Sequence, residues 1–251
     1  MDLEGRKEVF RALVGSYNYN LNTETSDKDY KIFVVPTFDD LYFNKQFSKS
    51  LIGETEDFDC HDIRKIPNLW WKANVNFLEV LYSEELYINP ELNEVTKGYI
   101  QTIFDLKDEI VKMNLPYLYN ACIGMHITKK GQIDIGTIGT QHLVDKFGYD
   151  TKQAMHSIRI LDFLLRFADN NFSDFKKAIW YEGEYDSKDW LLGLKNGCFS
   201  KEEFLNISKV ILKLVQNNYK DIYLSQKPNK EINDELIRII KEIVRIELQT
   251  G

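Results

Sequence analysis

The sequence has few cysteines and no long apolar run, and both shortages exclude classes of protein. Its three cysteines among 251 residues, Cys60, Cys122 and Cys198, are far apart and form no CxxC pair. Neither a disulfide framework nor a zinc site is therefore indicated. No apolar run approaches the length of a bilayer-spanning helix, and the charged start MDLEGRKEVF lacks the apolar centre of a signal peptide. We expect a cytoplasmic protein with no membrane partner.

Positive charge is also scarce. The chain has 32 Lys and Arg residues against 39 Asp and Glu residues, which gives a formal net charge of -7. Such a chain is a poor candidate for a long, sequence-independent track along nucleic acid. The balance still permits a small basic pocket around a triphosphate, or an RNA end held by few contacts. Hydrophobic residues at 43% and charged residues at 28% are values of a folded protein.

The order of apolar patterns predicts an α/β (α+β) fold. Residues 10–14 form a strand, or the tail of a helix, that runs into a turn at Gly15-Ser16, and YKIFVVP at 30–36 is typical of a strand. Further elements are expected as a strand at 57–63, two helical pieces within 66–82, helices at 94–113, 154–168, 201–220 and 231–248, and a connection at 129–140. We predict a small mixed-sheet domain over residues 1–105 and an α-helical domain over residues 106–251.

The stretch GSYNYNLNTETSDKDYKIFVV carries the chemistry. Asp27 and Asp29 stand at positions i and i+2 at the head of a strand, so their side chains are expected on one face. Two carboxylates there form an oxygen site suited to Mg²⁺, with Mn²⁺ as an alternative, and a cation would offset their repulsion. The turn at Gly15 and Ser16 offers N–H groups and a hydroxyl to phosphate oxygens. These are the parts that metal-assisted phosphoryl-type transfer needs.

The segment 54–62 carries five acids, Glu54, Glu56, Asp57, Asp59 and Asp62, from which a further carboxylate beside Asp27 and Asp29 could come. Asp57 and Asp59 share a face if this segment is extended, and the local pattern favours Asp59, which has apolar neighbours on both sides. Glu79, in the apolar run FLEVLY, is either a helix-surface residue or a support for the site. Lys152, His156 and Arg159 are spaced i, i+4 and i+7, so they lie on one helix face, which is either solvated or turned to phosphate.

The Gly-Ser turn, the spacer, the Asp-x-Asp pair and a later acid resemble the pattern of the polymerase-β nucleotidyltransferase superfamily. Lys28 stands where that pattern prefers an apolar residue. Two further segments, DFDCHDIRKIPNLWWKANVNFLEVLYS and FGYDTKQAMHSIRIL, are similar to conserved blocks of one predicted nucleotidyltransferase group within it. That group is called the RNA repair pathway DNA polymerase beta family. Val75 and Ile66 stand in place of its usual proline and aromatic residue.

The resemblance implies an enzyme that moves a nucleoside monophosphate from an NTP to a hydroxyl and releases pyrophosphate. Family spacing favours Asp57 over Asp59 as the third carboxylate, so the implied metal ligands are Asp27, Asp29 and Asp57. The nucleotide would be bound by residues of all three blocks, namely Gly15, Ser16, Lys65, Lys152, His156 and Arg159. The group's name implies RNA, for example a tRNA end, as the acceptor.

Two other functions compete with this interpretation. One is nucleotidyl transfer to a protein or a small molecule, as in toxin or antibiotic-modifying branches of the superfamily, and the acidic composition fits it better than RNA. The other is an inactive nucleotide-binding sensor, against which the retention of both Asp27 and Asp29 argues.

Overall fold

The computed structural model describes residues 2–182 and 187–250. The chain divides into two compact units, of which unit 1 is Met1–Asn114 with Pro228–Gly251 and unit 2 is Leu115–Lys227. This division differs from the expected one, because the last helix groups with the sheet and not with the other helices. The helix at 230–250 packs against the helices at 94–105 and 66–71, which explains its place in unit 1.

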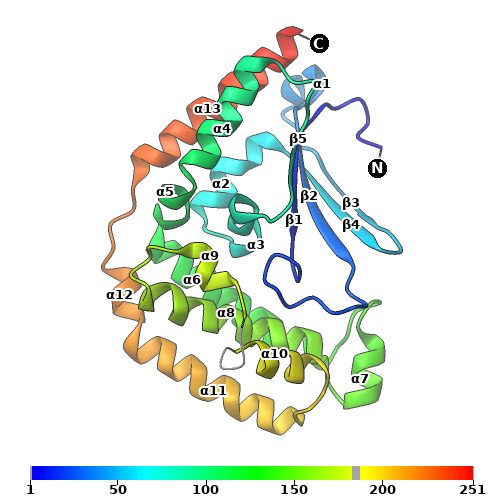
Figure 1. The fold of residues 1–251 in the computed structure, drawn as a ribbon, viewed down its shortest axis with the longest axis vertical. Coiled ribbons are helices and arrows are strands. Elements are labelled where there is room, and N and C mark those ends of the chain that lie inside the picture. Colours follow the sequence, from blue (N-terminus) through cyan, green and yellow to red (C-terminus); the bar gives the residue numbers. More distant parts are fainter. Residues whose placement is uncertain (1, 183–186, 251) are drawn as a thin grey trace. The chain divides into compact units, whose positions relative to one another are not determined.

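Unit 1 contains the sheet and the helices that pack on it (Figure 1). Its elements are β1 (Glu8–Val14), β2 (Lys28–Val34), α1 (Phe38–Tyr42), β3 (Ser48–Ile52), β4 (Glu56–Asp62), η1 (Ile63–Lys65), α2 (Ile66–Trp71), α3 (Val75–Leu78), η2 (Glu79–Tyr82), β5 (Leu86–Ile88), α4 (Glu94–Asp105), α5 (Lys107–Lys112) and α13 (Lys230–Thr250).

The five strands form one mixed sheet in the order β3-β4-β2-β1-β5. β2 and β4 are parallel, and the other neighbouring pairs are antiparallel. The mixed α/β class and the three strands expected from the sequence are therefore confirmed. The two edge strands, β3 and β5, were not predicted, because their residues are mostly exposed and show no buried alternation.

The two faces of the sheet carry different residues because side chains alternate along each strand. On one face, Phe10 packs against Phe33 and against Phe104 of α4, and the ring centroids are 4.8 and 5.6 Å apart, respectively. On the other face, Ile32, Val34 and Cys60 form a smaller apolar cluster. Asp29 and Asp57 belong to the first face, at the end where both parallel strands begin.

Unit 2 is helical and is built around one central helix. Its elements are α6 (Leu115–Gly131), α7 (Gln141–Phe147), α8 (Thr151–Asp169), α9 (Phe175–Ile179), α10 (Lys188–Lys195), α11 (Lys201–Asn218) and α12 (Lys220–Leu224). α8 packs against α6, α7, α9, α10 and α11. Most of its residues are buried, including Arg159 at 5% exposure.

The helical patterns expected within 154–168, 201–220 and 231–248 are confirmed, whereas α1, α6, α7, α9, α10 and α12 were not predicted. The expected helix at 94–113 breaks at Leu106 into α4 and α5. α6 was not predicted, because its apolar residues are spread around the helix and give no amphipathic stripe. Within the described ranges, no helix combines the length and the apolar character that crossing a bilayer requires.

Candidate functional site in unit 1

The geometry at the start of β2 and β4 brings two carboxylates together. Asp29 and Asp57 are direct partners in the parallel ladder, and both are half-buried. Neighbouring strands are about 4.8 Å apart, so the two side chains leave the same face side by side. Like charges in such positions repel, and a bound cation would remove the repulsion.

Gly15 lies directly beside this pair. It follows β1, whose last residue, Val14, is the antiparallel partner of Asp29. Its φ of +72° lies in the left-handed region that favours glycine. A Cβ atom at this position would overlap the Asp29 carboxylate and stand 3.2 Å from its Cγ. The glycine therefore lets the turn approach Asp29 as closely as it does.

A buried carboxylate beneath the turn fixes its backbone. Glu79, from η2, is 2% exposed, and its Oε2 accepts the Gly15 N–H at 2.9 Å. The buried Asn18 amide donates to the Glu79 carbonyl oxygen at 2.9 Å and to Oε2 at 3.3 Å. The Gly15 N–H is therefore already used within the protein, and Ser16 follows it in the turn with its N–H and hydroxyl.

Asp27 lies outside the strand. β2 begins at Lys28, and Asp27 is exposed in the preceding loop, two residues from Asp29. Among the described residues, no group of three or more His, Cys, Asp and Glu side chains is arranged to hold a metal ion. The structure thus brings Asp29 and Asp57 together and leaves Asp27 next to them along the chain.

Asp59 has different partners from Asp57. Its Oδ2 lies 2.8 Å from both Lys31 Nζ and His61 Nε2, and Ser50 Oγ donates to its Oδ1 at 3.0 Å. Burial opposes its ionisation, but the hydrogen bond with His61 and the charge of Lys31 outweigh it and lower the pKa of Asp59 well below its usual value. Asp57 instead accepts the Gly53 N–H at 3.2 Å. Asp59 therefore stabilises the sheet as part of a compensated network.

Lys65 lies beyond the opposite end of β4. The strand runs from Asp57 to its end at Asp62, roughly 16 Å at the usual rise of about 3.3 Å per residue, and η1 follows. The ladder therefore does not bring Lys65 to the start of β4.

The predicted basic stripe lies on α8, in unit 2. Lys152 is exposed, His156 is half-buried and Arg159 is buried, so the stripe runs from solvent into the unit. Burial and four surrounding cations lower the pKa of His156 well below its usual value. These cations are Arg159, Lys129, Lys152 and Lys195, the largest contribution coming from Arg159.

Three of the residues that shape these sites had no signal in the sequence. Asn18 sits in a polar stretch that resembles an ordinary loop, and only its contact with Glu79 shows its place. Lys129 and Lys195 belong to helices far from α8 along the chain, so only the packing reveals that they stand near His156.

The donor set around Asp29 and Asp57 fits a hard divalent cation. It consists of carboxylate oxygens, which suit Mg²⁺ and Mn²⁺ better than softer metals. Asp29 and Asp57 would hold such an ion between them.

A scan against protein-family models finds none that matches the chain, and a search of curated proteins finds no match either. The family expected from the motifs therefore stays a prediction.

Proposed function

We propose that this chain is a magnesium-dependent nucleotidyltransferase. The observation that carries the proposal is the pairing of Asp29 with Asp57 beside the Gly15 turn. Two half-buried carboxylates next to a tight backbone turn that carries a serine hydroxyl are the parts that metal-assisted transfer of a nucleotidyl group requires.

The residues of unit 1 have separate tasks in this reaction. Asp29 and Asp57 hold the cation, with Asp27 as an additional ligand, and Ser16 donates to phosphate oxygens. Glu79 is a positioning residue, because it fixes the turn through Gly15 and Asn18. When bound, Mg²⁺ neutralises the triphosphate and lowers the pKa of the attacking hydroxyl. The role that the resemblance gives to Lys152 and Arg159, which lie in unit 2, stays a prediction.

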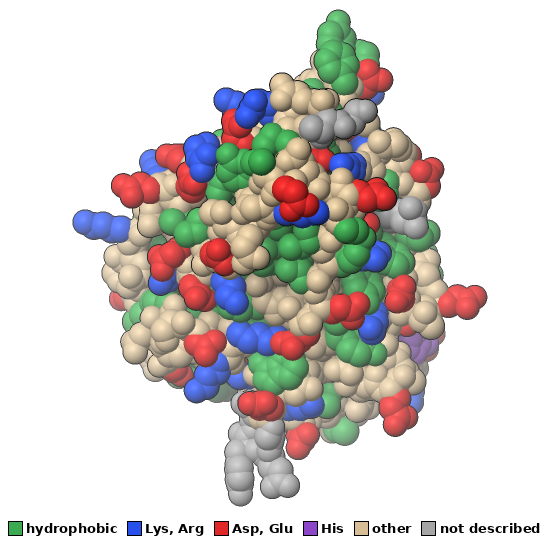
Figure 2. Space-filling view, turned by 45° about the horizontal axis from the view of Figure 1, so that its top comes forward, with side chains coloured by type: hydrophobic (Ala, Val, Ile, Leu, Met, Phe, Trp, Pro, Cys, Tyr) green, Lys and Arg blue, Asp and Glu red, His purple; other side chains and the backbone are tan. Residues whose placement is uncertain are grey.

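The proposed acceptor is an RNA hydroxyl, which follows from the resemblance and not from charge. On the face shown in Figure 2, basic and acidic side chains are interspersed. This distribution supports short contacts with an RNA end more than a track along a duplex. Proteins and small molecules are the competing acceptors that the experiment has to separate.

The test is incubation of the full chain with each labelled NTP and Mg²⁺, in the presence of total RNA or of RNase-treated lysate. We expect label in RNA. Label in protein or in a small molecule would replace the RNA acceptor but keep the enzyme class, whereas NTP binding without label would indicate a sensor.

Substitutions at the paired acids then test the site. Asp29→Asn and Asp57→Asn should each lower the rate at least about a hundredfold, because several kcal/mol of charge stabilisation are lost and each 1.36 kcal/mol corresponds to tenfold. Asp39→Asn removes an exposed carboxylate of the same unit and should leave the rate unchanged. Full activity in both paired-acid variants would show that the site lies elsewhere.

A further inference from the structure

The packing of α6 on α8 places a lysine opposite the basic stripe. His126 Nδ1 lies 2.9 Å from the Ser157 carbonyl oxygen, and the Asp150 N–H donates to Ile133 O at 2.7 Å. From His126 to Ile133 the chain advances, while the contacted residue moves back from Ser157 to Asp150. The two segments therefore run antiparallel. Lys129 comes between His126 and Ile133, so it faces the first turns of α8.

A second lysine reaches the same turns from α10. The Thr151 hydroxyl donates to the Lys195 carbonyl oxygen at 2.7 Å, which places the end of α10 at the first residue of α8. Lys195 is half-buried, as is Lys129. Together with Lys152 and His156, three helices thus supply four cationic or protonatable side chains to one region of unit 2.

The acidic neighbour of this cluster is Asp150, whose charge acts on Lys129. Within residues 2–182 and 187–250, none of Lys129, Lys152, His156 and Lys195 forms an ion pair with a carboxylate. The nearest acid in the sequence, Asp150, is fully buried and caps α8 by accepting the Gln153 N–H at 2.9 Å. Burial and then the neighbouring cations lower the pKa of both Lys129 and Lys195. Half-buried lysines that both lie near the charge of Lys152 are unlike an ordinary solvated basic face.

We propose that Lys129, Lys152, His156 and Lys195 form an anion site that binds a chain of two or more phosphate groups. Multiple phosphates match the several donors, which come from different directions, and would relieve the repulsion among them. The assignment of the ligand as the triphosphate of the substrate rests on the proposed function. The anion site itself rests on unit 2 alone.

The test uses the full chain and inorganic tripolyphosphate, without a divalent metal, in isothermal titration calorimetry. We expect one equivalent to bind, with an affinity that falls as the salt concentration rises. Lys152→Gln, at an exposed position that folding tolerates, and the double variant Lys129→Gln/Lys195→Gln should each weaken binding at least about tenfold, as expected for charge-assisted hydrogen bonds. Lys213→Gln, an exposed lysine of α11, is the matched control and should bind like the unmodified chain.

Further measurements separate this proposal from the proposed function. The double variant Asp29→Asn/Asp57→Asn should bind tripolyphosphate with the affinity of the unmodified chain, even where it has lost nucleotidyl transfer. ATP and a 5′-triphosphorylated oligoribonucleotide, compared with a 5′-hydroxyl oligoribonucleotide, distinguish a nucleotide from an RNA end as the source of the phosphates. Absence of tripolyphosphate binding, or equal weakening by Lys213→Gln, would overturn the anion site. The melting temperature without ligand shows whether the double variant Lys129→Gln/Lys195→Gln is folded. If it is not, the binding of tripolyphosphate to Lys152→Gln tests the anion site.

Discussion

Gly15 combines two constraints that no other residue type satisfies. Its backbone has φ +72°, and the space where a side chain would begin is filled by the Asp29 carboxylate. The sequence shows only a glycine before a serine. The need for glycine therefore arises from the approach of β2, and it connects the turn to the proposed metal site.

Gly15→Ala is expected to destabilise the protein and to displace Asp29. The left-handed conformation alone costs roughly 1–2 kcal/mol for a residue with a Cβ, and the overlap with the Asp29 carboxylate adds to it. Urea denaturation measures the loss. Gly98→Ala is the matched control, because Gly98 is exposed in α4 with open space at its Cβ position. That change should stabilise by about 0.5–1 kcal/mol. Equal effects of both substitutions would contradict this account.

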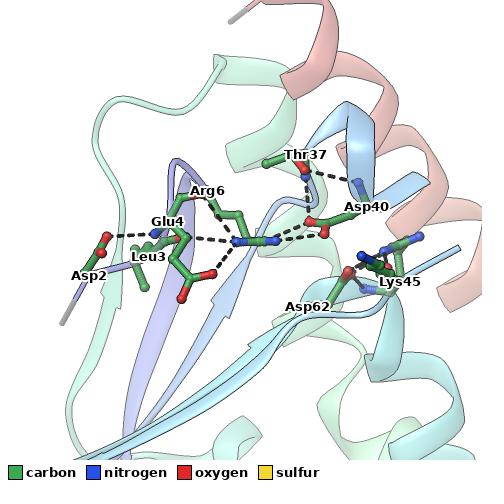
Figure 3. Close-up of polar contacts among 9 residues, drawn as sticks. Asp2, Leu3, Glu4, Arg6, Thr37, Asp40, Lys45 and Asp62 are labelled. Carbon is green, nitrogen blue, oxygen red and sulfur yellow. Dashed lines mark hydrogen bonds and ion pairs between the residues drawn. The ribbon is translucent and has the colours of Figure 1, made fainter. Parts of the chain in front are cut away.

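At the scale of the element, α1 is a five-residue helix that buries one of its two acids and exposes its aromatic residues. Asp40 is 4% exposed, whereas Phe38 and Tyr42 are 70% and 73% exposed. A capping box with Thr37 begins the helix, and Arg6 donates to both Asp40 oxygens, at 2.7 and 2.8 Å (Figure 3). So short a helix is held by these polar contacts and not by an apolar face.

The Arg6–Asp40 pair should make stability depend on acid pH. The hydrogen bond from Arg6 lowers the pKa of Asp40 from 3.8 to about 2. Because the folded pKa lies below the unfolded one, the pair stabilises the protein above about pH 4 and loses its effect as the pH falls through 2. The shift corresponds to roughly 2 kcal/mol.

Unfolding free energies of the unmodified chain and of Asp40→Asn, measured between pH 2 and 7, check this prediction. The stability difference between the two should be largest near neutral pH and should shrink between pH 4 and 2. Asp39→Asn, a neighbouring exposed acid, should follow the unmodified chain throughout. A gap between Asp40→Asn and the unmodified chain that stays constant over this range would refute the role of the pair.

At the scale of the whole molecule, unit 1 is completed by the end of the chain. α13 packs on α4 and α2. Its buried Glu247 carboxylate accepts hydrogen bonds from Lys7 Nζ at 2.7 Å and from the Asn93 N–H at 3.0 Å. The stability of the sheet unit therefore depends on residues that follow all of unit 2 in the sequence.

Ile243→Ala, in α13, should destabilise unit 1 strongly. Ile243 is fully buried, so its truncation is expected to cost about 2–5 kcal/mol through lost transfer energy and a cavity. Ile237→Ala, on the same helix but 49% exposed, should cost less than about 1 kcal/mol. Hydrogen exchange reports where the loss occurs, and we expect faster exchange in β1 and β2 for Ile243→Ala. Unchanged exchange in these strands would show that α13 does not support the sheet.

The sequence by itself determined the elements whose residues repeat with a clear period. β2, α8, α11 and α13 were predicted for that reason, because burial on one face imposes alternation or helical spacing. It also singled out Gly15, Ser16, Asp27 and Asp29, whose types and order are visible along the chain, whereas the local pattern and the family spacing differed over Asp57 and Asp59. Short elements such as α1 and β5 have no such period and were missed.

Only the tertiary structure decided which residues meet. The parallel register of β2 and β4 pairs Asp29 with Asp57 and Lys31 with Asp59, and no pattern along the chain shows this pairing. The return of α13 to unit 1 and the convergence of three helices on His156 also join residues far apart in sequence. Contacts of this kind depend on packing geometry, which local propensity and periodicity do not encode.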